Sequence, residues 1–175
     1  MKKILSLIVA CLLLLSLCAC GSEPTLVGSN GGDNNSSAET NKDKVFKVGD
    51  TVSLKDVEVT FIGITENEGS EYIKPADGKV FVLCEFEISN KSDEDLIVSS
   101  LMNFQTYCDD YSCDISFGAT VGADEKEQLD GTVAAGKKLK GVVGYEVSSD
   151  WKELEIRYQP DLLSSDKIVF ATNNG

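Results

Sequence analysis

The sequence predicts an all-β fold for residues 45–172, an antiparallel β-sandwich of about seven strands. Three observations support this prediction. Apolar and polar residues alternate with a period of two, glycine and aspartate separate the alternating segments, and almost no segment shows helical periodicity. The length of this region suits one domain.

The two clearest strands are expected at residues 57–62 and 80–88. In the first, Val57, Val59 and Phe61 share one face, and in the second every even-numbered residue is apolar. Such alternation is typical of strands that bury at least one face. The later strands show the same habit and are expected at residues 95–108, 113–118, 138–147, 154–159 and 167–172.

One helical turn is expected at residues 150–153. Asp150 can cap a helix, and Glu153 follows three residues later, which is the spacing of a capping box. A single turn of this kind is expected to connect two strands.

The first 19 residues have the features of a signal peptide. Lys2 and Lys3 give a positive start, and residues 4–19 form an uncharged, proline-free run. A helix needs about 20 apolar residues to span a bilayer, so this run is too short for a permanent span. We therefore expect residues 1–19 to be removed.

The end of this leader, Leu17-Cys18-Ala19-Cys20, resembles the bacterial lipobox. The resemblance implies cleavage before Cys20 and a diacylglyceryl anchor on its sulfur, with further acylation such as palmitate. Two acyl chains are enough for stable attachment to a membrane. We therefore expect a lipid-anchored protein on the outer face of a bacterial cytoplasmic membrane, of the Gram-positive type. A plain secreted protein is the alternative.

Residues 20–44 are expected to form the anchor and a flexible linker. They are rich in glycine, serine and asparagine and poor in apolar side chains. Such a segment buries too little surface to offset its conformational entropy. As a coil of about 23 residues it would reach roughly 26 Å, which keeps the domain near the membrane.

Three cysteines remain beyond the anchor, Cys84, Cys108 and Cys113. If residues 109–112 form a four-residue hairpin loop, Cys108 and Cys113 face each other, and we expect a structural disulfide between them. A redox pair normally has two intervening residues, and a zinc site is disfavoured because the chain has no histidine. Cys84 shares a face with apolar neighbours and is expected to be a buried, inert thiol.

The sequence contains no recognisable catalytic set, so we expect no enzyme activity and no cofactor or metal. The absence of histidine excludes His-dependent triads. Ser149 and Lys152 match an S-x-x-K spelling, but the companion motifs of that enzyme class are missing. The acidic clusters at residues 93–95, 109–114 and 124–130 do not match a calcium loop. The net charge of −13 disfavours nucleic acid as a partner.

Two stretches carry a family resemblance, at residues 78–100 (GKVFVLCEFEISNKSDEDLIVSS) and 129–160 (LDGTVAAGKKLKGVVGYEVSSDWKELEIRYQP). They resemble extracellular immunoglobulin-like domains, called telokin-like, that occur in lipoproteins of Gram-positive bacteria and have no known function. The similarity runs from about residue 46 to 170. It implies an immunoglobulin-like β-sandwich, and it supplies no catalytic residues.

Together these features predict a membrane-anchored extracellular lipoprotein with a non-enzymatic binding or interaction module. Its expected partner is another envelope protein, or a peptide added along a sheet edge. The alternative is a solute- or calcium-binding lipoprotein that serves a transporter. An enzyme of an unrecognised type is the third hypothesis.

Overall fold

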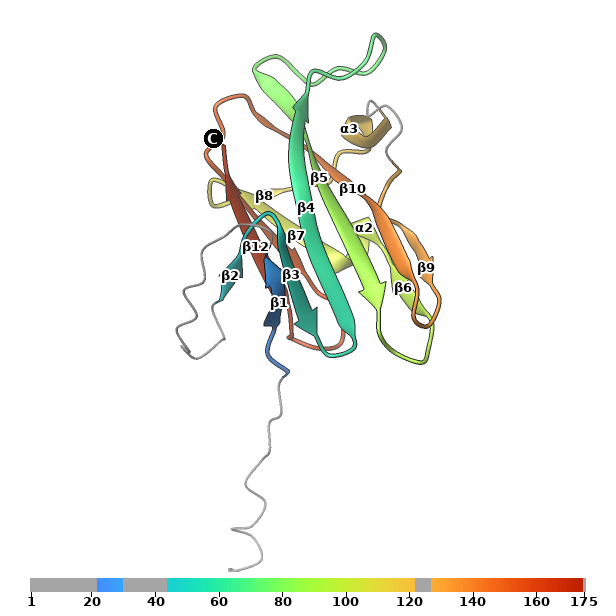
Figure 1. Ribbon diagram of the computed structural model, residues 1–175. Coiled ribbons are helices and arrows are strands. Elements are labelled where there is room, and N and C mark those ends of the chain that lie inside the picture. Colours follow the sequence, from blue (N-terminus) through green and yellow to red (C-terminus); the bar gives the residue numbers. More distant parts are fainter. Residues whose placement is uncertain (1–21, 30–43, 122–126, 175) are drawn as a thin grey trace, which may run out of the picture.

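The computed structural model describes residues 22–29, 44–121 and 127–174. Two five-stranded sheets pack face to face, which confirms the predicted β-sandwich (Figure 1). The first sheet, sheet A, consists in spatial order of β1 (Thr25–Ser29), β3 (Asp50–Leu54), β4 (Val57–Asn67), β5 (Lys79–Asn90) and β10 (Lys138–Ser148). The second, sheet B, consists of β2 (Val45–Phe46), β12 (Ile168–Asn173), β11 (Glu153–Tyr158), β7 (Phe104–Cys108) and β8 (Tyr111–Cys113).

The smaller elements lie at one side of the sandwich. β6 (Leu96–Val98) and β9 (Gly131–Val133) form a separate antiparallel pair. Two short helices, α2 (Ser100–Asn103) and α3 (Phe117–Val121), connect strands. All strand pairs among the described residues are antiparallel except β2 and β12, which run parallel. The described chain has more strands than the predicted seven, because β1, β2, β3 and β9 were not predicted and the expected strand at residues 95–108 is divided into β6 and β7.

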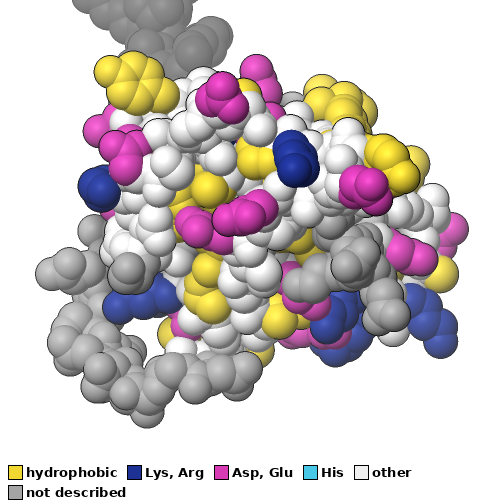
Figure 2. Space-filling model, turned by 90° about the horizontal axis from the view of Figure 1, so that it is seen from above, with side chains coloured by type: hydrophobic (Ala, Val, Ile, Leu, Met, Phe, Trp, Pro, Cys, Tyr) yellow, Lys and Arg dark blue, Asp and Glu magenta, His cyan; other side chains and the backbone are white. Residues whose placement is uncertain are grey.

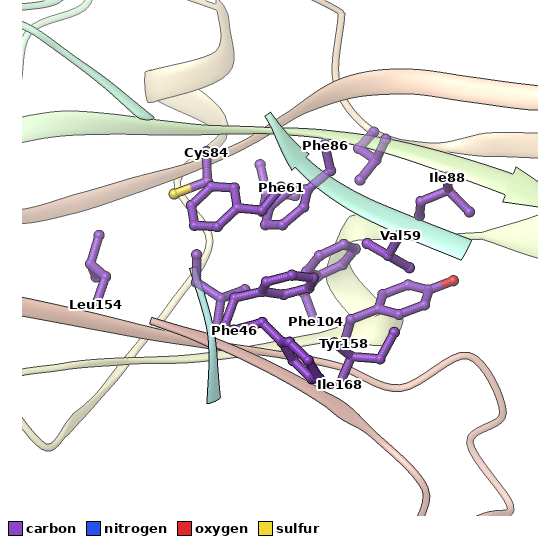
Figure 3. Close-up of a cluster of buried hydrophobic side chains, with 14 of the residues drawn as sticks. Phe46, Val59, Phe61, Cys84, Phe86, Ile88, Phe104, Leu154, Tyr158 and Ile168 are labelled. Atoms are coloured by element: carbon purple, nitrogen blue, oxygen red, sulfur yellow. The ribbon is translucent and has the colours of Figure 1, made fainter. Parts of the chain in front are cut away.

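The core lies between the two sheets and is dominated by aromatic rings (Figure 3). Phe61 and Phe86 from sheet A stack at 4.6 Å between ring centroids. Phe170 from sheet B lies 5.7 Å from Phe61 and 5.8 Å from Phe86. Aromatic side chains bury a large apolar area and favour offset or edge-on packing at these distances. This cluster therefore joins the two sheets.

Two predicted strands are shorter than expected. The expected strand at residues 95–108 is interrupted by α2, where the Asn103 side chain accepts a hydrogen bond from the Ser99 amide and donates one to the Gln159 carbonyl. The expected strand at residues 113–118 is wrong beyond Cys113, because β8 ends there, Ile115 forms only an isolated bridge, and α3 begins at Phe117. The predicted helical turn at residues 150–153 is a non-helical turn. There Trp151 is buried, and its indole Nε1 donates to Glu66.

α3 covers part of the outer face of sheet A. It buries Phe81 and Leu83, which point away from the main core, together with Val142. Gly144 makes this close approach possible, because a Cβ atom there would lie 2.8 Å from the Cβ of Ala119. Sheet A is therefore buried on both faces at this end, which explains why the sequence of β5 is almost continuously apolar from Val80 to Cys84.

The linker prediction is wrong for residues 25–29. These residues form β1, which pairs antiparallel with β3 at the edge of sheet A. Backbone pairing does not require a hydrophobic pattern, and all five residues of β1 are exposed. The predicted leader at residues 1–19, the predicted acylation site Cys20 and residues 30–43 lie outside the described residues. In the described part of the chain, no helix is long and apolar enough to cross a membrane.

Candidate functional site

A groove with a volume of about 660 Å³ lies between β8 and the end of β10. It forms where the chain leaves sheet B and crosses to sheet A. After β8, Ile115 pairs with Tyr145 of β10, and the Ser116 amide donates to the Gly144 carbonyl at 2.7 Å. This crossing fixes the distance between the two sheet edges, so the groove is built into the topology.

The groove combines an apolar base with an acidic rim. Residues that are buried or half-buried provide the base: Cys108, Cys113, Ile115 and Val147. The rim carries the exposed Asp109, Tyr111 and Asp114, the half-buried Glu146 and one lysine, Lys79. Since Lys79 is paired with Glu146 at 3.5 Å, the rim as a whole is negative. An apolar base with a few polar groups around it is the usual make-up of a binding site.

The rim is partly pre-ordered by backbone contacts. The Asp109 carboxylate accepts hydrogen bonds from the amides of Lys152 and Glu153, both at 2.9 Å. These bonds fix the β7–β8 turn to the connection between β10 and β11. Seen from above in Figure 2, acidic side chains are spread over this end of the molecule with apolar side chains between them. The acidic character is therefore not confined to a single cluster.

The groove lies at the end of the sandwich opposite to where β1 begins. Thr25 pairs with Ser53, next to the turn between β3 and β4. Lys79 and Ser148, by contrast, pair where β5 begins and β10 ends. β4 connects the two ends, and its 11 residues correspond to about 36 Å at 3.3 Å per residue (Figure 1).

The predicted hairpin loop at residues 109–112 is wrong. The turn contains only two residues, Asp109 and Asp110, with φ angles of 49° and 69°. Two positive φ angles are the mark of a type I′ turn, which aspartate tolerates. As a result Cys108 pairs with Tyr111, while Cys113 pairs with Thr106 two residues further along. The two cysteines share one face of the hairpin but are diagonal neighbours, not a directly opposed pair.

Both thiols are free in the structure, as is Cys84. The disulfide between Cys108 and Cys113 stays a prediction. If it forms, it joins diagonal positions of the β7–β8 hairpin and not directly opposed ones. Burial raises the pKa of the Cys113 thiol to about 11, and the neighbouring Cys108 adds to the shift. Burial, with a smaller effect of Asp109, also raises the pKa of Cys108. A raised thiol pKa lowers the thiolate fraction at neutral pH, so these are not activated nucleophiles.

Cys84 is fully buried in the core, as predicted. Its burial raises the pKa of the thiol far above the usual value, and the nearby Cys113 adds to the effect. A buried thiol with such a pKa behaves as a small apolar side chain.

Beneath the groove, a buried hydrogen bond joins the two sheets. The Thr106 hydroxyl of β7 donates to the Tyr145 hydroxyl of β10 at 2.7 Å, and both side chains are buried. Burial raises the pKa of Tyr145 well above its usual value, although the bond to Thr106 lowers it slightly. Tyr145 is therefore a neutral, structural residue that holds the base of the groove in place.

Other predicted positions do not assemble into a chemical site. Ser149 and Lys152 lie in the turn after β10, where no helix aligns them. Within the described residues, no three histidine, cysteine, aspartate or glutamate side chains are grouped so that they could hold a metal ion. The acidic cluster at residues 124–130 falls partly outside the described residues.

The groove is not predicted by the local sequence. Its walls come from β8 and from the end of β10, which are about 35 positions apart and meet only through pairing across the crossing. Residues 113–117 alternate in polarity as a strand does, so the local sequence carries no signal for the crossing between the sheets.

Solved structures of other proteins share this fold. The YjhA protein of Bacillus subtilis is 16% identical, with a TM-score of 0.60 over 72% of this chain and 98% of that chain. The YcdA protein of B. subtilis, described as a candidate lipoprotein, is 18% identical, with a TM-score of 0.56 over 67% of this chain and 36% of that chain. This chain thus spans about a third of the length of YcdA. A conserved hypothetical protein of Bacillus anthracis is 20% identical, with a TM-score of 0.50 over 65% of this chain and 89% of that chain.

No functionally curated protein matches the sequence. Residues 46–169 match the family DUF4352, described as a domain of unknown function. The match has nearly the same bounds as the family resemblance seen in the sequence. The description of DUF4352 mentions neither a telokin-like relation nor a lipid anchor. Because the match covers most of the chain, the protein belongs to the DUF4352 family.

Proposed function

We propose that this protein is a lipid-anchored, extracellular, non-enzymatic binding module. Its groove between β8 and β10 would hold an extended, basic segment of another envelope protein. The observation that carries the proposal is the position of the groove, which lies between two sheet edges at the end opposite to the start of β1. A domain anchored before β1 would therefore present the groove away from the membrane.

The shape and charge of the groove support this ligand class. β8 is the last strand of sheet B, so an extended segment can lie along its outer side. The apolar base at Cys113 and Ile115 suits an aliphatic side chain. The exposed carboxylate of Asp114 favours a lysine or arginine of the ligand.

The anchor part of the proposal rests on the lipobox-like sequence that ends at Cys20. The description of YcdA as a candidate lipoprotein is consistent with it. Replacement of Cys20 by serine should release the protein from the membrane fraction, because the acyl chains are attached through the cysteine sulfur.

Site-specific photo-crosslinking on cells tests the binding function. A photoreactive amino acid placed at the exposed groove residue Ser112 should give a discrete crosslinked product. The same probe at the exposed Asp56, in the turn at the other end of the sandwich, should not give that product. Asp114→Lys should abolish the product formed from position 112, because it repels a basic ligand. Identical products from both positions, or a product insensitive to Asp114→Lys, would contradict the proposal.

A further inference from the structure

β1 joins the sandwich by backbone pairing at the edge of sheet A. It pairs with β3 from Thr25 opposite Ser53 to Ser29 opposite Asp50, with an irregularity between Leu26 and Gly28. Each of its five residues is exposed, and none belongs to the hydrophobic clusters of the core. A strand held in this way can leave the sheet without opening the core, because the hydrogen bonds that it loses are replaced by bonds to water.

β3 does not depend on β1. Val52 and Leu54 are fully buried, and β3 pairs along its other side with β4. The hydroxyls of Thr51 and Thr60 are hydrogen-bonded at 2.8 Å across that pair. If β1 leaves, β3 therefore remains in place and exposes an unpaired edge, which is a template for another strand.

The chain that follows β1 is long enough for exchange between molecules. Residues 30–44 separate β1 from β2. Fifteen residues span at most about 50 Å when extended. A domain of this size is roughly 36 Å across if it is compact. β1 of one molecule can therefore reach β3 of a neighbour while its own domain stays folded.

The chemistry of β1 also suits a second copy as the partner. Its sequence, TLVGS, has no charged side chain, so it adds no like-charge repulsion between molecules with a net charge of −13. Exchange would recreate in trans the same strand pairing that the structure contains in cis. A high density of these molecules on one membrane would favour the exchange. The effective concentration of a neighbour's β1 at the edge of β3 then approaches that of the chain's own β1.

We propose that the edge of β3 is a strand-binding site for a second copy of this chain, in which residues 25–29 of one copy pair with residues 50–53 of the other. The product is a symmetric, strand-exchanged dimer. The site is separate from the groove, and the proposal is independent of what the groove binds.

Two chains, each with one introduced cysteine, test the exchange without interference from the cis arrangement. One full-length chain carries Thr25→Cys and the other carries Ser53→Cys, both with Cys108→Ser and Cys113→Ser, and they are co-produced in one bacterial membrane with different tags. Directly opposed positions of an antiparallel pair have Cβ atoms about 4.5–5.5 Å apart, which a disulfide can bridge with small adjustments. A covalent heterodimer through these positions forms only if β1 of one copy reaches β3 of the other.

The matched control pairs the Thr25→Cys chain with a Thr132→Cys chain, whose exposed cysteine lies on β9, outside sheet A. We expect about tenfold more heterodimer from the 25/53 combination, and more of it at higher protein density in the membrane. A second pair of chains, with Ser29→Cys and Asp50→Cys, tests the other end of the same register. It replaces the first pair if a lowered melting temperature shows that the Thr25→Cys or Ser53→Cys chain is misfolded. Equal crosslinking in the 25/53 combination and its control would overturn the proposal.

Discussion

The buried bond between Thr106 and Tyr145 gives a sharp test of how the two sheets are held together. Thr106→Val keeps the shape of the side chain but removes its hydroxyl, which leaves the Tyr145 hydroxyl without its only hydrogen-bond partner within the described structure. Tyr145→Phe removes the other hydroxyl of the pair and leaves the Thr106 hydroxyl without this hydrogen bond. Both groups are buried, so neither change can be compensated fully by water.

The expected magnitudes follow from the cost of a buried, unpaired hydroxyl. Each single substitution should lower the free energy of unfolding by about 1–3 kcal/mol. The double substitution removes both hydroxyls and leaves no unpaired group, so it should cost much less than the sum of the two. The coupling free energy of the cycle should therefore be about 1–3 kcal/mol.

Urea unfolding of the four proteins, followed by fluorescence of the buried Trp151, measures these differences. The slope with urea should stay constant, so that a change in midpoint reports stability alone. Gln105→Ala, at an exposed position of the same strand, controls for unspecific effects on β7. If the effects of the two single substitutions on the free energy of unfolding were additive, the coupling free energy would be near zero. This result would refute a stabilising hydrogen bond between the two hydroxyls.

Three further predictions concern packing and the thiols. Gly144→Ala should destabilise the protein by about 1–3 kcal/mol in urea unfolding, because its Cβ would lie 2.8 Å from that of Ala119, whereas Gly63→Ala, with no atom within 4 Å, should be nearly neutral. Phe86→Ala removes the ring that contacts both sheets and should cost about 3–5 kcal/mol in the same assay. In reduced protein, in which the Cys113 thiol is free, its alkylation should be slow at pH 8 and rise with an apparent pKa of about 11. Because this folded-state pKa is raised from 9.0, the contribution of Cys113 to stability is retained below pH 9 and lost as the pH rises to 11. Each expectation has a result that would contradict it. These results are an alkylation rate that levels off near pH 9, an unchanged free energy of unfolding for Phe86→Ala, and equal losses of stability for Gly144→Ala and Gly63→Ala.

Alternation in the sequence was sufficient to predict the sandwich and much of its core. Val57, Val59 and Phe61 are buried as expected, and β10 and β11 agree with their predicted bounds within one residue. These elements are regular, and each buries one clear face, so the local pattern reflects the tertiary structure.

The remaining features depend on contacts that the local sequence does not encode. β1 was missed because a strand held by its backbone needs no apolar face. The β7–β8 turn was predicted too long, because the two aspartates at 109 and 110 can adopt positive φ angles where glycine is more usual. The groove was missed because it exists only where β8 and β10 meet, at the point where the chain crosses between the sheets.

We propose that a lipid anchor holds one end of the sandwich near the membrane and leaves the groove at the far end. Energy transfer to an acceptor in the lipid headgroups tests it, with a donor dye at Asp56→Cys or at Ser112→Cys in full-length protein that carries Cys108→Ser and Cys113→Ser. The two positions lie at opposite ends of strands that span about 36 Å. The account predicts strong transfer from position 56 and weak transfer from position 112. Equal transfer from both positions, or stronger transfer from position 112, would contradict it.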